Sequence, residues 1–331
     1  MKPRRPRIVI SNWVHEDVLA RLAAIGEVDA NRTRTPWSWG QLTKRAALAD
    51  ALLAFMTDHV DVDFLVACLK VIACALKGFD NFDVEACTAA GVWVTIVPDL
   101  LTNPTAELAV ALALGLGRKL READALVRSG KFKGWRPILY ATGLDQSVVG
   151  IVGLGAVGRA IATRLSGFGC RILGVDPSVE APPDVMRCEL PAALAASDYL
   201  IVAVPLSADT FHMIGRDALK GMKPGALLVN VGRGSVVDEA AVADALERGA
   251  LGGYAADVFE MEDWARPDRP RVIEPRLLSH RLTLLTPHLG SAVDRARREI
   301  ALQAADNIID ALSGRTPRHA VNKPVRSRAA S

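Results

Sequence analysis

The sequence predicts an α/β protein with two Rossmann-like domains, each built on a doubly wound parallel sheet. Short apolar runs alternate along the chain with amphipathic helical stretches, as parallel strands joined by crossover helices require. The runs are apolar at almost every position, which is typical of strands buried on both faces. A glycine-rich turn follows the run at 148–152 and opens a helix. We therefore expect one dinucleotide-binding domain and a second, smaller α/β domain.

The first hundred residues carry the elements of the smaller domain. Its helix is predicted at His15–Ile25, where apolar positions recur at helical spacing. Its strands are runs of apolar and β-branched residues, predicted at Arg7–Ser11, Ala51–Met56, Val71–Leu76 and Val92–Val97.

A long helical pattern, Pro104–Arg128, leads out of the smaller domain. It begins near Asn103 and ends before Ser129 and Gly130, which are residues typical of helix ends. A helix of this length commonly links two domains. The next segment, Lys131–Asp145, is rich in Gly, Trp, Pro and Tyr and is predicted to be a loop or arm.

The middle of the chain contains a second alternating series, with six predicted strands. They are Val148–Val152, Arg171–Val175, Tyr199–Val204, Ala226–Val231, Gly253–Val258 and Thr283–Leu285. A last helix, Ser291–Leu312, is expected to return to the smaller domain. The smaller domain is then discontinuous, 1–100 plus 291–331, and the nucleotide-binding domain is 101–290 with the long linking helix at its start.

Composition excludes several classes of protein. Hydrophobic residues make up 50% and charged residues 23% of the chain, so it is not expected to be disordered. The longest apolar stretch is shorter than the roughly 20 residues that span a bilayer. No long apolar region follows the basic start, so we do not expect that start to be a signal peptide. The net charge is only +3. Part of the basic excess lies in the tail, in Arg315, Arg318, Lys323, Arg326 and Arg328.

The cysteines point to a cytoplasmic protein with reduced thiols. Their number, five, is odd, and no Cys-x-x-Cys pair occurs among Cys68, Cys74, Cys87, Cys170 and Cys188. This pattern argues against a disulfide framework and against a zinc ribbon. We expect no metal site, no membrane partner and no nucleic-acid partner.

The glycine-rich turn predicts a site for the pyrophosphate of a dinucleotide. Gly153 allows the tight turn, Gly155 lets the backbone approach the phosphates, and Gly158 lets the helix pack on the strand. Ala156 and Val157 complete the turn, at the helix N-terminus whose amides face the phosphates. Asp176 ends the next strand, where a carboxylate accepts from ribose hydroxyls and repels a 2′-phosphate, so NAD is favoured over NADP. The alternative is a plain glycine turn beside a surface aspartate.

Three segments at predicted strand ends carry candidate catalytic residues. Arg233, Glu262 and His288 each follow a different strand of the nucleotide-binding domain. In open α/β sheets the carboxyl ends of the strands face the ligand crevice. An arginine fork binds an oxyanion, a histidine exchanges a proton near neutral pH, and a glutamate beside it orients the ring. Taken singly, each residue has a structural alternative: a turn cap, a solvated carboxylate or a structural histidine.

These motifs together resemble the NAD-dependent D-2-hydroxyacid dehydrogenase family over nearly the whole chain. The resemblance implies a catalytic triad of Arg233, Glu262 and His288, and a substrate domain made from both termini. It also implies that Asp257 contacts the nicotinamide carboxamide and that other residues line the cofactor, namely Pro205, Val231 and Gly232. A homodimer is implied too, with the 131–145 arm exchanged between subunits.

A second set of residues is similar to the phosphite dehydrogenase branch of that family. Lys77 lies where the wider family has a glycine-rich carboxylate-binding loop, and Phe259–Arg266 resembles the same branch. Lys77 and Arg233 together suit the two charges of phosphite. The resemblance predicts oxidation of phosphite to phosphate by hydride transfer to NAD, with water as the nucleophile. The substrate-binding residues it implies are Lys77, Arg233, Arg297, Met56, Trp135, Tyr140 and Ser291.

Three other interpretations remain open from the sequence. A 2-keto acid reductase or D-2-hydroxyacid dehydrogenase, acting on glyoxylate or hydroxypyruvate, needs the same triad, and only Lys77 speaks against it. An NAD-sensing interaction protein would share the fold. A nucleic-acid protein has only the basic tail, Arg315–Arg328, in its favour, and we expect that tail to be disordered.

Overall fold

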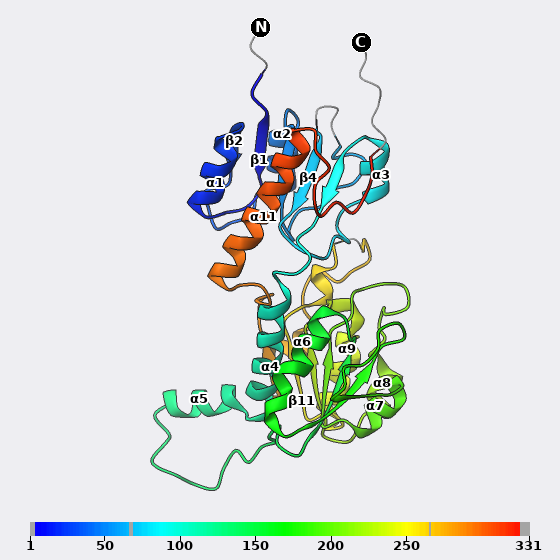
Figure 1. Ribbon diagram of the computed structural model, residues 1–331. Coiled ribbons are helices and arrows are strands. Elements are labelled where there is room, and N and C mark those ends of the chain that lie inside the picture. Colours follow the sequence, from blue (N-terminus) through cyan, green and yellow to red (C-terminus); the bar gives the residue numbers. More distant parts are fainter. Residues whose placement is uncertain (1–3, 66–68, 265, 325–331) are drawn as a thin grey trace. The chain divides into compact units, whose positions relative to one another are not determined.

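The computed structural model describes residues 4–65, 69–264 and 266–324 (Figure 1). The chain divides into two compact units, the first formed by 1–101 together with 293–331 and the second by 102–292. Within the described residues, each unit contains one sheet of parallel strands, with five strands in the first and seven in the second. The predicted α/β class with two doubly wound sheets is confirmed.

The first sheet has the strand order β2-β1-β3-β4-β5. Its strands are β1 (Arg7–Ile10), β2 (Glu27–Ala30), β3 (Ala51–Ala54), β4 (Val71–Cys74) and β5 (Trp93–Thr95). β2 was not predicted, because this short edge strand is partly exposed and carries Glu27 and Asp29 instead of an apolar run.

Helices cover both faces of the first sheet. They are α1 (Glu16–Ala23), α2 (Trp39–Ala46), α3 (Val84–Ala89) and α11 (Asp294–Leu312). α1 and α11 share one apolar core with the sheet, and α2 and α3 share the other. The final helix therefore packs in the first unit through buried residues such as Ile300 and Ile308 (Figure 1).

The segment after α11 pairs with the first sheet beside β5. Val321 N–H donates to Val94 O at 2.9 Å, and Thr95 and Ala320 form an antiparallel bridge. The expected disorder of the basic tail is therefore wrong for residues 315–324, because backbone pairing orders a segment whose side chains give no sign of it. Three residues named in the sequence analysis lie outside the described residues: Cys68, Arg326 and Arg328.

The second sheet has the strand order β12-β11-β10-β9-β6-β7-β8. Its strands are β6 (Val148–Val152), β7 (Arg171–Val175), β8 (Val185–Arg187), β9 (Tyr199–Val202), β10 (Leu227–Asn230), β11 (Gly253–Ala256) and β12 (Thr283–Leu285). β8, a short and largely exposed edge strand, was not predicted. Successive strands are added on one side of β6 up to β8 and on its other side from β9 to β12. The order of strands therefore reverses between β6 and β9, and ligands of this fold bind at such a point.

Helices also cover both faces of the second sheet. α4 (Thr102–Gly117) and α6 (Ala156–Leu165) share one core. The other core is formed with α7 (Leu190–Ala196), α8 (Arg216–Gly221), α9 (Glu239–Glu247) and α10 (Pro275–Ser279).

The predicted single helix Pro104–Arg128 is wrong, because it is broken into α4 and α5 (Leu120–Arg128). Lys119 has a left-handed backbone with φ 53°, which ends the first helix. α4 packs tightly on the sheet, and a Cβ at Gly117 would lie 2.0 Å from the Tyr199 hydroxyl. α5 has no buried residue, so only α4 is fixed against the core.

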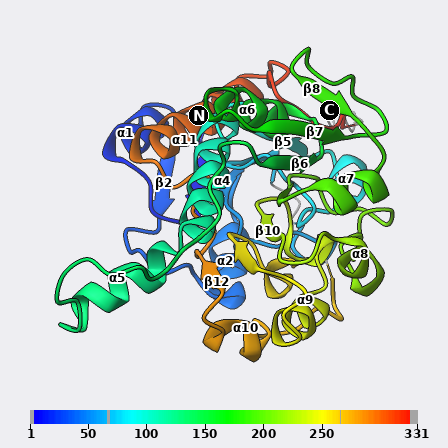
Figure 2. The same cartoon turned by 90° about the horizontal axis from the view of Figure 1, so that it is seen from below.

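The segment 131–145 forms a loop without helix or strand, as predicted. Figures 1 and 2 both show α5 and this loop standing away from the second sheet. Among the described residues, no helix combines the length and apolar character that crossing a membrane requires.

Candidate active site

The three predicted catalytic segments follow three neighbouring parallel strands of the second sheet. Arg233 lies shortly after β10, Glu262 after β11 and His288 after β12. Because these strands run parallel and pair in register, their carboxyl ends meet at one edge. The structure thus places all three segments at the same edge of one sheet, as the sequence predicted.

His288 and Glu262 form a direct hydrogen-bonded pair. The distance from Nδ1 of His288 to Oε2 of Glu262 is 2.5 Å, and both side chains are partly exposed. His288 itself has a left-handed backbone with φ 54°, and its N–H donates to Asp257 O at 2.9 Å. Because Nδ1 is bound to the glutamate, the ring presents Nε2 for proton exchange with a ligand.

Asp257 fixes the turn that carries His288. Its Oδ1 accepts from Thr286 Oγ1 and from Leu289 N–H, both at 2.6 Å, and its Oδ2 accepts from Gly290 N–H at 2.8 Å. The side chain is buried, and this burial raises its pKa above the ordinary aspartate value. Its contacts in this structure are with the turn, and its predicted contact with a nicotinamide carboxamide stays a prediction.

A buried asparagine at the end of β10 shapes the turn that carries Arg233. Asn230 Nδ2 donates to Arg233 O at 2.9 Å, and Asn230 Oδ1 accepts from Gly232 N–H at 3.1 Å. A Cβ at Gly232 would lie 2.5 Å from Val204 O, so only glycine permits this approach to the segment before Pro205. The predicted cofactor-lining residues Val231, Gly232 and Pro205 therefore belong to two adjoining strand ends.

The glycine turn after β6 has the form that a pyrophosphate requires. Gly153 has φ 97°, and a Cβ at Gly158 would lie 1.8 Å from Gly153 O. A Cβ at Gly155 would meet no heavy atom within 4 Å, so the space over the turn is open. Ala156 and Val157 start α6, whose first amides point into that space. These residues fit a dinucleotide phosphate.

Asp176 is an ionised acceptor beside this turn. Its Oδ2 accepts from Leu154 N–H at 2.8 Å, and its Oδ1 accepts from Ser178 and Val179 N–H, both at 2.9 Å. Partial burial works against its charge, but these backbone donors hold the pKa of Asp176 below its usual range. A carboxylate in this place suits the ribose hydroxyls of NAD.

Three predicted substrate-binding residues gather at the carboxyl edge of the first sheet. Met56 follows β3, and Lys77, which is exposed, follows β4. Arg297 extends from α11 to Ala75 O, 3.3 Å away, and its guanidinium lies 5.6 Å from the centre of the Phe55 ring. Burial lowers the pKa of Arg297.

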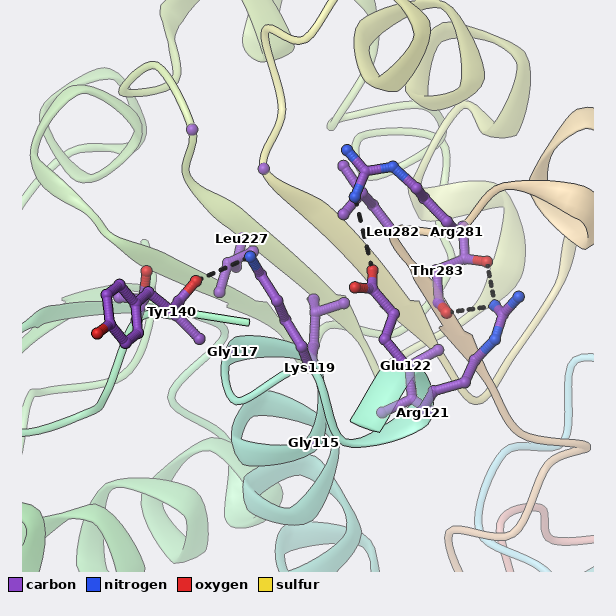
Figure 3. A pocket seen from close by; sticks show the side chains of 16 residues that line it. Gly115, Gly117, Lys119, Arg121, Glu122, Tyr140, Leu227, Arg281, Leu282 and Thr283 are labelled. Atoms are coloured by element: carbon purple, nitrogen blue, oxygen red, sulfur yellow. Dashed lines mark hydrogen bonds and ion pairs between the residues drawn. The ribbon is translucent and has the colours of Figure 1, made fainter. Parts of the chain in front are cut away.

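The two other predicted substrate-binding residues with large side chains, Trp135 and Tyr140, belong to the second unit. Both are on the exposed loop after α5, 83% and 74% exposed. Tyr140 lines a cavity of about 450 Å³ with Leu227 and Thr283, which begin β10 and β12, so it lies at the amino-terminal edge of the second sheet. Figure 3 shows Lys119 Nζ bound to Tyr140 O, at 2.9 Å, in this cavity. Within one chain, Tyr140 is thus on the opposite edge from Arg233.

Sequence reasoning missed the buried polar residues that shape the site loops. Asn230 is one, and Asp58 is another: it accepts from Ser11 Oγ and, at 2.7 Å, from Phe55 N–H. Burial raises the pKa of Asp58 to about 6. Asn81 Nδ2 donates to Met56 O at 2.7 Å in the same loop. The available signal was a short polar residue at or soon after the end of an apolar run, and this signal does not tell which backbone group the side chain binds.

The described residues contain no group of three or more His, Cys, Asp or Glu side chains placed to bind a metal ion. Four cysteines of the described chain have free thiols: Cys74, Cys87, Cys170 and Cys188.

Comparison with known proteins identifies the second unit. Residues 110–290 match the family described as D-isomer specific 2-hydroxyacid dehydrogenase, NAD binding domain. The chain is 36% identical to a glyoxylate reductase of Thermococcus litoralis, over 97% of this chain and 98% of that protein. It is also 36% identical to a glyoxylate reductase of Korarchaeum cryptofilum, over 97% of each.

Solved structures agree with these matches. A protein of Thermus thermophilus superposes with a TM-score of 0.89 at 32% identity, covering 96% of this chain and all of that one. An NADPH-dependent glyoxylate/hydroxypyruvate reductase from Sinorhizobium meliloti, in complex with NADP and malonate, has a TM-score of 0.84 at 30% identity, over 98% and 99% of the two chains.

These findings correct the predicted phosphite chemistry. Relatives aligned over nearly their whole length are named glyoxylate reductase, so the prediction of phosphite oxidation to phosphate is wrong. The charge argument failed because an exposed lysine suits one carboxylate as well as it suits phosphite, so Lys77 does not discriminate between them. The chain belongs to the D-isomer specific 2-hydroxyacid dehydrogenase family and is an NAD-dependent oxidoreductase.

Proposed function

We propose that this protein is a 2-keto acid reductase that converts glyoxylate or hydroxypyruvate to the corresponding 2-hydroxy acid. The observation that carries the proposal is the alignment, over 97% of the chain, with relatives named glyoxylate reductase. The pair of His288 and Glu262, at the same sheet edge as Arg233, supplies the groups that this chemistry needs.

The second unit contains the residues that would bind the dinucleotide. Gly153, Gly155 and Gly158 would accommodate the pyrophosphate, and Asp176 would accept from the adenosine ribose. Strand ends nearer the catalytic residues, at Pro205, Val231, Gly232 and Asp257, would line the nicotinamide half. When bound, NADH supplies a hydride to the substrate carbonyl carbon.

The chain's own residues would bind the substrate and move the proton. Arg233 would bind the carboxylate and carbonyl oxygens through its planar fork of donors. His288, protonated and oriented by Glu262, would give its proton from Nε2 to the carbonyl oxygen as that oxygen becomes a hydroxyl. In the reverse direction the same nitrogen would take the hydroxyl proton. Four more residues stay predicted to bind substrate: Lys77, Arg297, Met56 and Ser291.

The function is tested by the loss of NADH absorbance with purified protein and glyoxylate, hydroxypyruvate or pyruvate, in parallel. We expect turnover with glyoxylate or hydroxypyruvate, and faster turnover than with pyruvate. Absence of turnover with every 2-keto acid, while NADH still binds, would contradict the proposal and favour an NAD-sensing interaction protein.

Replacing Asp176 by alanine is expected to reduce the preference for NADH over NADPH. Loss of a hydrogen bond to a charged group costs about 1.5–3 kcal/mol, so the ratio of kcat/KM values should fall by roughly 10- to 100-fold. A general loosening of the glycine turn would lower kcat/KM for both cofactors to the same extent, so it would not change their ratio. Asp184→Ala, at an exposed position before β8, is the matched control. An unchanged ratio would remove Asp176 from cofactor selection.

We also propose that the protein is a homodimer. The loop and α5 expose large apolar side chains, among them Leu120, Val127, Trp135 and Tyr140. A second copy of the chain would cover them and would allow Trp135 and Tyr140 to approach the partner's substrate. Sedimentation of the intact chain tests this, and a monomer at micromolar concentration would contradict it.

A further inference from the structure

Glu239, which is buried, and Glu260, which is partly buried, bind each other's backbone near the edge that carries Arg233, Glu262 and His288. Glu239 begins α9, and its Oε1 accepts from Glu260 N–H at 2.8 Å. Glu260 Oε1 accepts in return from Glu239 N–H at 3.0 Å. Glu239 Oε2 accepts from Glu274 N–H at 3.1 Å, and Glu260 Oε2 lies 3.1 Å from Nε2 of His212. No proposed catalytic step uses either glutamate.

The paired glutamates connect the two turns that carry catalytic side chains. Glu260 begins a 3₁₀ helix, η3 (Glu260–Glu262), that ends at the partner of His288. The Arg233 turn continues into a second 3₁₀ helix, η2 (Gly234–Val236), just before Glu239. The two are in backbone contact, since a Cβ at Gly234 would lie 1.9 Å from the carbonyl carbon of Phe259. A movement of either turn is therefore transmitted to the other.

Further bonds join the same two turns. Ser235 N–H donates to Oδ2 of Asp263, the residue after Glu262, at 2.7 Å. His212 N–H donates to Ser235 O at 2.7 Å, while its ring binds Glu260. The His212 ring also stacks on Phe211, with ring centres 4.0 Å apart. His212 thus touches one turn through its backbone and the other through its side chain.

Burial of the Glu239 carboxylate disfavours its charged form, and hydrogen bonds from two backbone N–H groups offset part of this cost. Its side chain is 3% exposed, and burial raises its pKa to about 7, although the two backbone donors oppose this. Several groups surround it from the neighbouring elements: Glu260 and Glu262 of η3, Tyr254 of β11, Glu274 and Arg276 at the start of α10, and, through Glu260, His212. A neutral amide would avoid the charge but would lose one of the two acceptors.

We propose that Glu239 and Glu260 are positioning residues for the dehydrogenase reaction, because their reciprocal hydrogen bonds fix the turn carrying Glu262 against the turn carrying Arg233 and so set the orientation of His288. The proposal depends on the proposed 2-keto acid reductase function only for its kinetic readout. Neither glutamate needs to touch substrate or cofactor.

The test compares Glu239→Gln and Glu239→Asp with wild type. Glutamine keeps the length and loses the charge and one acceptor, whereas aspartate keeps the charge and is too short to reach both backbone donors. We expect both variants to lower kcat for glyoxylate by roughly tenfold or more, with KM and the Kd of NADH changed less than about threefold, since misplacement of a catalytic group lowers the rate of chemistry. Glu247→Gln and Glu247→Asp, at the exposed far end of α9, are the matched controls.

A second readout needs no turnover. The chain has six histidines, so ¹³C-labelled histidine spectra can follow each ring, with the His288 signal assigned by its loss in His288→Gln. We expect the ring carbon signals of His288 to move in both Glu239 variants and to stay in place in the Glu247 controls, because a displaced Glu262 changes the hydrogen bond at Nδ1. If wild type fails to reduce 2-keto acids, the proposed function fails, and this measurement still decides the positioning role.

Three results would overturn the inference. Wild-type kcat and unchanged His288 ring signals in both variants would show that the contacts are dispensable. A change in Glu239→Gln alone would assign the effect to charge rather than position. A rise in KM without a fall in kcat would indicate a binding role instead.

If the Glu239 variants fail to fold, His212→Asn provides the test. Asparagine tolerates the left-handed backbone at this position, φ 48°, and His212 is partly exposed, so the substitution is mild. It removes the ring bound to Glu260. We expect a fall of a few-fold in kcat with KM unchanged, and a change in the His288 ring signals. Wild-type values of both would overturn the proposal.

Discussion

Replacement of His288 by glutamine is expected to lower kcat for glyoxylate by about 10²- to 10⁴-fold, the range that general acid–base catalysis contributes. The ring is bound through Nδ1 to Glu262 at 2.5 Å, which leaves Nε2 to exchange the proton with substrate. Glutamine has a similar size and still offers polar atoms to Glu262, but it cannot carry the proton. The loss should therefore appear in kcat, measured from NADH consumption at saturating glyoxylate.

The control for this variant is His280→Gln. His280 belongs to the same unit but precedes β12, at the amino-terminal edge of the sheet, so its loss should leave kcat near the wild-type value. Binding of NADH, followed by its fluorescence, should be unchanged in both variants because the glycine turn lies after a different strand, β6. Turnover of His288→Gln within a few-fold of wild type would exclude His288 as the proton donor.

The sheet edge that carries the proposed catalytic residues was predictable because parallel strands bring distant segments together in a regular way. Arg233, Glu262 and His288 each follow an apolar run, and runs in one parallel sheet end at a common edge. Periodicity and strand-end position therefore located the residues without any knowledge of their contacts. The pair of His288 and Glu262 confirms that two of these segments are directly bonded.

What the sequence did not reveal depends on tertiary contacts. Gly117, the last residue of α4, is of a type common at helix ends, but apolar residues continue past it, so the break at Lys119 becomes clear only from the packing of α4 on the sheet. The edge strands β2 and β8 are short and exposed, so they lack the apolar run that identifies buried strands. Asn230 and Glu239 would pass as surface residues in the sequence, and only their buried backbone partners show what they do.

The substrate was mispredicted for a related reason. In the sequence, only Lys77, a single exposed side chain, favours phosphite over a 2-keto acid as the substrate. A lysine ammonium is a point charge on a flexible stem, and it binds many anions with little discrimination. Arg233, with its fixed fork, carries more information about the ligand, and a planar carboxylate is the group that such a fork fits best.

Arg233→Met is the second variant with a large expected effect. Hydrogen bonds to a charged group contribute about 1.5–3 kcal/mol each, so loss of a two-pronged contact should lower kcat/KM for glyoxylate by roughly 10²- to 10⁴-fold. Methionine fills much of the space of the arginine stem, and the turn itself is fixed by Asn230 through backbone groups. The fold and NADH binding should therefore survive the change.

Arg233→Lys separates charge from geometry at this position. Lysine retains the positive charge but cannot donate a planar pair of hydrogen bonds, so we expect its kcat/KM to lie between those of wild type and Arg233→Met. Arg248→Met, at the exposed end of α9, is the control for loss of an arginine from the same unit. If Arg233→Lys matches wild type, the site needs only a cation, and the substrate is not bound through a bidentate carboxylate contact. If Arg233→Met also matches wild type, Arg233 lies outside the substrate site. The turn that Asn230 and the two paired glutamates hold in place would then have no role in substrate binding.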